Sequence, residues 1–144
     1  MKRFLCTLLV LCLIPVCVSA VDLSDFNMYA YIFGEDEIDL SAGRTSKAFT
    51  IYESNGCTIA FKEEDGEIKT IVVEGDGLPF VSYAMAAIMF FAPDSSDFVL
   101  NSGRFLSQFL MFRRKQETEM GTLSTGANFQ ITTSDKGALF MVMR

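Results

Sequence analysis

The sequence predicts an α+β fold in which an antiparallel sheet of about five or six strands carries two or three helices, packed mainly on one face. Two turn signals, Asn55-Gly56 and Asp65-Gly66, separate strand-like segments. An uncharged apolar segment has the composition of a buried helix, and another strand-rich section closes the chain. The expected order is one helix, three strands, two helices and two or three strands, and such interrupted runs are typical of α+β proteins.

The first twenty residues, Met1–Ala20, have the composition of a secretory signal peptide. Two basic residues follow Met1, an uncharged apolar run extends from Phe4 to Cys17, and small residues precede Val21. The run is about fourteen residues, shorter than the roughly twenty of a membrane-spanning helix. We expect cleavage after Ala20, which leaves a single globular domain of residues 21–144, secreted to the extracellular or periplasmic space and without a transmembrane segment.

The cysteine positions argue against disulfides and against a lipid anchor in the mature chain. Cys6, Cys12 and Cys17 lie within the signal, so the mature chain keeps only Cys57 and forms no internal disulfide. Lipid anchoring at Cys17 is disfavoured, because Val16 stands where bacterial lipoproteins usually have a small residue. Cys57 falls in a strand-like segment, which favours a small core residue over a reactive thiol.

The first mature segment favours a helix from Asp25 to Phe33, capped by Ser24 and ended by Gly34. The apolar positions that share one helical face are Phe26, Tyr29, Ala30 and Phe33. A strand over Met28–Phe33 remains an alternative, because that run is rich in aromatics. The segment Glu35–Ser46 is interpreted as a polar connection.

The two turn signals define a meander. Three antiparallel strands are expected: Lys47–Glu53, Cys57–Glu63 and Glu67–Glu74. If both turns have two residues, Tyr52 lies opposite Ile59, and Ile59 lies opposite Val72. One face then carries Thr50, Tyr52, Ile59, Phe61, Ile68, Thr70 and Val72. The other carries Phe49, Ile51, Ala60, Lys62, Lys69 and Ile71.

A helix from Phe80 to Phe91 follows, with Pro79 in its first turn. It contains no charged residue and is too short to span a bilayer, so we expect it to be the central core helix. Three small residues would let it approach the sheet closely: Ala84, Ala86 and Ala87. A second helix is expected to begin between Ser96 and Ser102 and to end at Arg113–Lys115, where positive charge complements the helix dipole.

The chain is expected to end with a hairpin around Ser134–Gly137. Its arms are Asn128–Thr133, in which Phe129 and Ile131 alternate, and Ala138–Met143, in which Leu139, Met141 and Met143 alternate. A short strand over Thr118–Leu123 would add a third member to this group.

The composition excludes several classes of chemistry. The chain has no histidine, which rules out histidine-activated nucleophiles, histidine-ligated zinc and histidine general bases. The mature chain has ten basic and eighteen acidic residues, a net charge of 10 − 18 = −8, which argues against binding nucleic acid. The acidic segment Gly34–Asp39 does not match the calcium-binding EF-hand spacing. Gly121–Gly126 lacks the lysine and the strand-to-helix context of a phosphate-binding loop. We therefore expect no cofactor and no metal ion.

The remaining functional signal is a surplus of large apolar side chains. The candidates for an apolar pocket or interface are Met85, Met89, Phe90, Phe105, Phe109 and Phe112. Core packing would account for them as well, and so would a homodimer formed through an exposed helix or sheet face. The hypothesis is an exported, non-enzymatic binding or interaction domain whose partner is an unknown protein or an apolar small molecule.

The alternative is a small hydrolase that works outside the cytoplasm with two carboxylates facing each other across a cleft. The acidic segments that would supply them are Glu35–Asp39 and Glu63–Glu67. Because both resemble solvated loops, the sequence assigns no catalytic residue.

Export makes the first testable prediction. When the full chain is expressed in a secreting host, the protein outside the cytoplasm should begin at Val21, as measured by intact-mass spectrometry and N-terminal sequencing. A lipid on Cys17, or a protein that retains Met1, would contradict this prediction.

Overall fold

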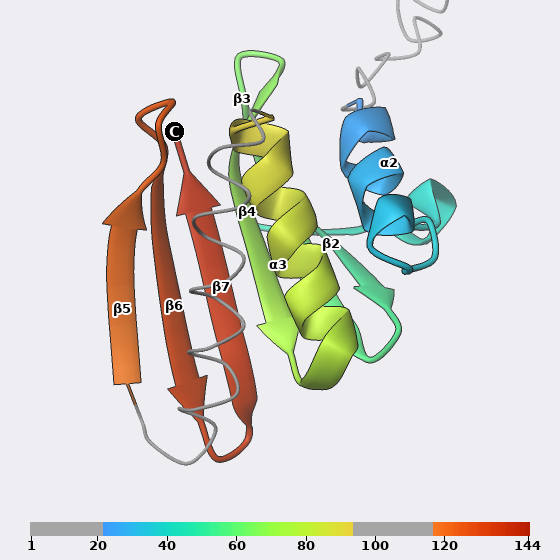
Figure 1. The fold of residues 1–144 in the computed structure, drawn as a ribbon. Helices are drawn as coiled ribbons and strands as arrows, with labels where there is room; N and C mark the ends of the chain where they lie inside the picture. Colours follow the sequence, from blue (N-terminus) through green and yellow to red (C-terminus); the bar gives the residue numbers. More distant parts are fainter. Residues whose placement is uncertain (1–21, 94–116) are drawn as a thin grey trace, which may run out of the picture.

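A computed structural model describes residues 22–93 and 117–144 of the chain (Figure 1). The helical elements are α2 (Ser24–Ile32), the 3-10 turn η1 (Leu40–Ala42) and α3 (Gly77–Phe91). The strands are β1 (Arg44–Ser46), β2 (Phe49–Ser54), β3 (Cys57–Glu64), β4 (Glu67–Gly75), β5 (Glu117–Thr122), β6 (Asn128–Ser134) and β7 (Gly137–Met143).

All these strands form one antiparallel sheet in the order β1-β2-β3-β4-β7-β6-β5. The helices α2 and α3 lie on the same face of this sheet (Figure 1). The predicted α+β class is therefore confirmed, although the sheet has seven strands rather than five or six. The signal segment and the second helix ending at Arg113–Lys115 lie outside the described residues.

The additional strand is β1, which lies inside the segment expected to be a polar connection. Lys47 adopts a left-handed backbone conformation, with φ of 57°, and turns the chain so that Thr45 pairs with Thr50. The Lys47-Ala48 dipeptide is not a recognised hairpin signal, so the turn preferences of the residues do not predict β1.

The two predicted hairpin turns are confirmed. Asn55 and Gly56 have φ of 49° and 76°, and Asp65 and Gly66 have φ of 56° and 78°. Positive φ at both central residues is typical of the tight turns that match strand twist. The first turn places Tyr52 opposite Ile59, as expected.

The register beyond the second turn differs from the prediction. Glu63 pairs with Ile68 but Lys62 pairs with Thr70, so Lys69 is an extra residue in β4, a β-bulge. Ile59 consequently lies opposite Val73 rather than Val72. Without the bulge, strict alternation would turn Thr70 and Val72 toward the helices. With it, the buried residues of β4 are Ile68, Ile71 and Val73.

The helix α2 begins one residue earlier than expected, and the predicted Ser24 cap is wrong. The carboxylate of Asp22 accepts the Ser24 N–H at 2.9 Å, and the Ser24 side chain caps nothing. The predicted end is confirmed: Gly34 has φ of 88°, and the Glu35 N–H reaches back to the Ala30 carbonyl at 3.0 Å. The predicted helix is therefore confirmed, and the alternative strand over Met28–Phe33 is wrong.

The helix α3 forms the centre of the helical layer, as its composition predicted. The carboxylate of Asp76 accepts the Gly77 N–H at 2.8 Å, and Pro79 falls in the first turn. Ala84, Ala86 and Ala87 are fully buried, and the helix lies over β4 and β7 (Figure 1). The residues of α3 that are buried are Phe80, Val81, Tyr83, Ala84, Ala86, Ala87, Ile88 and Phe91.

Aromatic rings connect α2 to the rest of the core. The ring of Phe26 meets Phe61 of β3 edge to face, with centroids 5.0 Å apart, and stacks parallel to Tyr83 of α3 at 6.4 Å. Such pairs add about 0.5–1.5 kcal/mol each beyond the area they bury. Phe26 therefore fixes α2 to both the sheet and the central helix.

The C-terminal hairpin is confirmed, and Leu139, Met141 and Met143 share one face of its second arm as expected, but this face is not the buried one. Only two residues, Asp135 and Lys136, separate the paired ends of β6 and β7, so Ile131 lies opposite Phe140. The buried residues of β7 are therefore Ala138, Phe140 and Val142. Leu139, Met141 and Met143 lie on the opposite face.

The bulge makes a direct prediction about stability. Ile71→Ala should lower the free energy of unfolding by about 2–5 kcal/mol, because it empties space in the core. Val72→Ala, its neighbour on the opposite face, should cost about 1 kcal/mol or less. Urea denaturation measures both, and a larger loss for Val72→Ala would mean that the strand has no bulge.

Candidate functional site

The apolar residues singled out in the sequence do not form one described cluster. Met85 and Phe90 of α3 are half-buried and pack against the core, and Met89 is half-buried as well. The Phe90 ring meets Phe91 edge to face at 5.4 Å. Phe105, Phe109 and Phe112 lie outside the described residues, so a pocket built from both groups stays a prediction.

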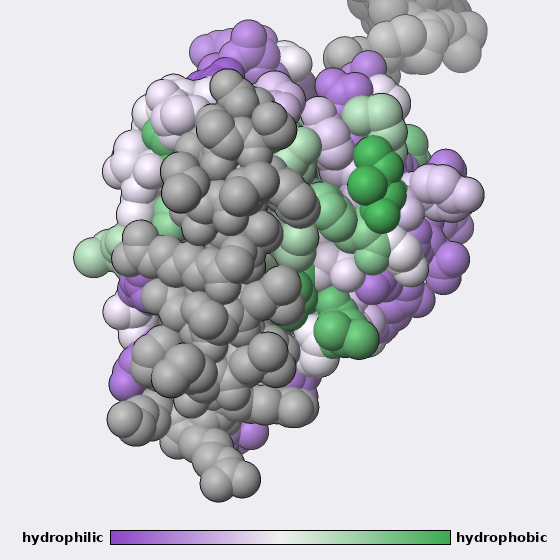
Figure 2. All heavy atoms as spheres, in the orientation of Figure 1, coloured by the Kyte–Doolittle hydropathy of each residue, from purple (hydrophilic) through white to green (hydrophobic). Residues whose placement is uncertain are grey.

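A different apolar surface lies on the outward side of α2. Met28, Tyr31 and Ile32 are 48%, 73% and 63% exposed, and their spacing of three and four residues puts them on one side of the helix. We call these three residues the α2 patch. Figure 2 shows apolar side chains over α2, bordered by hydrophilic residues.

The α2 patch is not among the candidate residues predicted from the sequence, although the sequence of α2 contains a signal for it. Phe26, Tyr29 and Ala30 point inward, while the α2 patch points outward, so α2 is apolar on both sides. A surface helix of a soluble protein normally pairs an apolar face with a polar one. The outward side of α2 departs from this pattern, because it exposes three large apolar side chains.

Acidic residues precede and follow the α2 patch in the chain. Between Asp22 and Gly43 the chain has six acidic and no basic residues. Asp22 and Asp25 are exposed at the start of α2, and Asp36 and Glu37 are exposed beyond its end. A hydrogen bond from the Ser24 hydroxyl, and a second from its N–H, hold the pKa of the Asp22 carboxyl below its ordinary value. The segments that flank the patch in the sequence, which we call the acidic rim, therefore carry negative charge at neutral pH.

The sheet face opposite the helices, here called the outer face, has a regular arrangement. Cross-strand pairing places its side chains in three parallel rows. The central row is Arg44, Ile51, Ala60, Val72, Met141, Gln130 and Met120. The Glu74 row is Glu53, Thr58, Glu74, Leu139, Thr132 and Thr118. The Lys62 row is Ser46, Phe49, Lys62, Thr70, Met143, Asn128 and Thr122.

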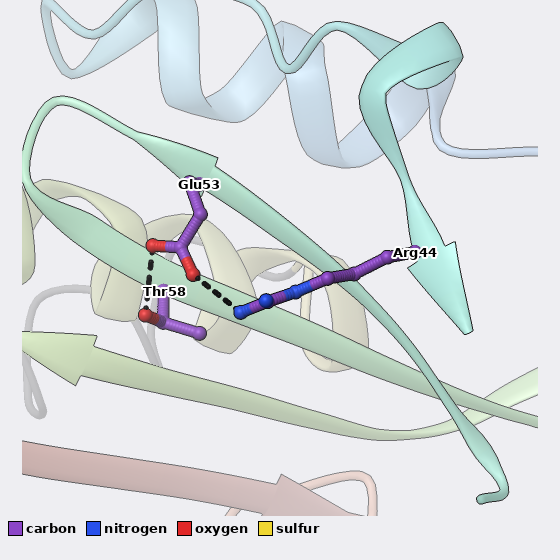
Figure 3. A network of polar contacts seen from close by, with 3 residues as sticks. All are labelled: Arg44, Glu53 and Thr58. Carbon is purple, nitrogen blue, oxygen red and sulfur yellow. Dashed lines mark hydrogen bonds and ion pairs between the residues drawn. The ribbon is translucent and has the colours of Figure 1, made fainter. Parts of the chain in front are cut away.

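Polar contacts fix one corner of the outer face (Figure 3). The Arg44 guanidinium lies 3.0 Å from one carboxylate oxygen of Glu53, and the Thr58 hydroxyl donates to the other at 2.9 Å. Lys62 forms an ion pair with Glu64 at 2.5 Å, and this contact keeps the pKa of the Glu64 carboxyl low. Both pairs are solvent-exposed and contribute little to stability.

Two hollows open along the strands at this side of the protein. One, of about 350 Å³, is polar, and the side chains of Thr58, Glu74, Ser134 and Lys136 contribute to it. The other, of about 430 Å³, is bordered by Met120, Thr122, Gln130 and Met143. The polar hollow holds one carboxylate, that of Glu74, whereas acid/base hydrolysis of a glycoside needs two that face each other.

Two carboxylates of the acidic segments Glu35–Asp39 and Glu63–Glu67 make polar contacts at the surface. Glu35 accepts a hydrogen bond from the Asn55 amide at 2.7 Å. Glu67 pairs with Lys69, which lowers the pKa of the Glu67 carboxyl. In residues 22–93 and 117–144, histidine, cysteine, aspartate and glutamate side chains form no group of three or more suited to a metal ion.

Cys57 and Tyr83 are buried polar groups of the core. Burial raises the pKa of the Cys57 thiol to about 11, so the thiol is protonated at neutral pH and is a poor nucleophile. A side chain at Gly75 would place its Cβ 2.6 Å from the Cys57 sulfur, which explains the glycine there. The Tyr83 hydroxyl lies 2.7 Å from the Ser54 hydroxyl and donates to the Asp36 carbonyl at 3.3 Å.

Comparison with known proteins gives no match: no family model, no curated protein and no solved structure matches this chain. Within the described part of the chain, no helix is both long and apolar enough to cross a membrane.

Proposed function

We propose that this chain is an exported, non-enzymatic interaction domain that binds a protein partner through the α2 patch. The observation that carries the proposal is the exposure of Met28, Tyr31 and Ile32 on one turn of a helix whose other side is already buried. Exposed apolar clusters with a polar rim are typical of protein interfaces. Tyrosine in particular is enriched among the residues that dominate binding energy.

The charge around the patch supports a particular kind of partner. An apolar stripe on the partner would cover Met28, Tyr31 and Ile32, and basic residues beside that stripe would meet Asp25, Asp36 or Glu37. An amphipathic helix with Lys or Arg on its flanks has these features. Membrane adsorption is disfavoured, because the acidic rim would be repelled by anionic lipids.

Selection from a random peptide library against the immobilised mature domain tests this proposal. Enriched peptides should combine apolar residues at helical spacing with basic flanks. They should bind about tenfold or more weakly to Ile32→Glu, which places a charge in the patch. Their affinity should also fall as salt rises from about 0.05 to 0.5 M, because screening weakens the contribution of the rim.

Met120→Glu is the matched control. Met120 is as exposed as Tyr31, at 73%, but lies on the outer face of β5, away from α2. It should leave peptide affinity unchanged. Peptides that bind wild type and Ile32→Glu equally, or a selection that enriches no basic, apolar sequence, would contradict the proposal.

A further inference from the structure

The outer face is comparable in size to a protein interface. Its three rows cross seven strands, which at about 4.8 Å per strand gives a footprint of roughly 600 Å² before side-chain relief is counted. Stable interfaces bury about 800 Å² per partner, which is of the same order. The apolar members of the face are Phe49, Ile51, Ala60, Val72, Met120, Leu139, Met141 and Met143.

The charges of this face are segregated by row. Glu53 and Glu74 both lie in the Glu74 row, and Lys62 lies in the Lys62 row on the other side of the apolar centre. Arg44 extends from the central row to Glu53. Lys62 also pairs with Glu64 of its own copy, but such a partly exposed pair is weak, so Lys62 can meet the acidic row of a second copy that is turned over.

We propose that the outer face binds a second copy of this chain, so that two sheets form a sandwich around a twofold axis parallel to the central row. Each strand then faces its own counterpart, and the Glu74 row of one copy faces the Lys62 row of the other. Val72 and Met141 meet the same residues of the second copy at the centre. Sheets packed in this way lie about 10 Å apart and are rotated by about 30°.

Electrostatics selects this axis over the alternative. In the proposed arrangement, Lys62 of the second copy lies between Glu53 and Glu74, one strand spacing from each. An axis parallel to the strands would instead place the central strand β4 over itself, because β4 is the middle strand of seven. Glu74 would then face Glu74, and like charges at an interface are costly.

The hollow beside Met143 also fits the proposal. Leu139 of the second copy lies opposite Met143, because both residues belong to β7 and stand in opposing rows. The hollow of about 430 Å³ bordered by Met120 and Met143 is large enough to receive that side chain. Met120 and Met143 supply the apolar part of its border, and an apolar side chain placed against them is removed from water.

Sedimentation equilibrium of the secreted chain, residues 21–144, tests the dimer first. Wild type should show a concentration-dependent monomer–dimer equilibrium, and Met141→Lys should be monomeric with an unchanged circular dichroism spectrum. The control Ile32→Lys adds the same charge to the α2 patch and should leave the dimer intact. A protein that is monomeric up to about 1 mM, or a dimer that Met141→Lys does not disrupt, overturns the proposal.

Charge exchange tests the axis. Lys62→Glu and Glu74→Lys should each weaken dimerisation about tenfold or more, because each places like charges together across the interface. The double variant carries both substitutions in every copy and should recover most of the wild-type affinity. If the two effects simply add, Lys62 and Glu74 do not meet and the proposed arrangement is wrong.

Discussion

The extra residue Lys69 in β4 determines which side chains of the central strand meet the helices. β4 pairs with β3 on one side and β7 on the other. Its inward–outward alternation of side chains, here called its phase, therefore affects both halves of the sheet. The bulge brings Ile71 inward in place of Thr70, and it turns Val72 and Glu74 outward. Without it, a polar side chain would lie in the core and a carboxylate would point at α3, at a cost of several kcal/mol. Core composition therefore requires the bulge.

Both candidate surfaces depend on that phase. On the helical side, Ile71 and Val73 complete the core on which α3 lies, and Phe26 of α2 packs against Tyr83 of α3. This packing leaves Met28, Tyr31 and Ile32 on the outside. On the other side, Val72 and Glu74 supply the centre and the acidic edge of the outer face. A sandwich dimer would carry one α2 patch on each of its two outer surfaces and would be bivalent toward a partner.

Local signals in the sequence predicted much of the fold. The Asn55-Gly56 and Asp65-Gly66 turns, the end of α2 at Gly34 and the buried character of α3 each rest on a few neighbouring residues. The errors concern relations between segments. The bulge at Lys69 arises because burying the apolar Ile71 is more favourable than burying Thr70, and only the packed sheet reveals this. Which face of β7 is buried was not predicted, because it depends on a two-residue turn at Asp135-Lys136 that carries no strong signal. The α2 patch became visible only once the buried side of α2 was known.

The central claim is the phase of β4, and nuclear Overhauser contacts between strands measure it most directly. In the isotopically labelled mature domain, backbone protons of Ile59 should show cross-strand contacts to Val73, and those of Phe61 to Ile71. These contacts place Val72 and Glu74 on the outer face. Contacts from Ile59 to Val72 and from Phe61 to Thr70 would show a strand without a bulge, and both proposed surfaces would then lose their structural basis.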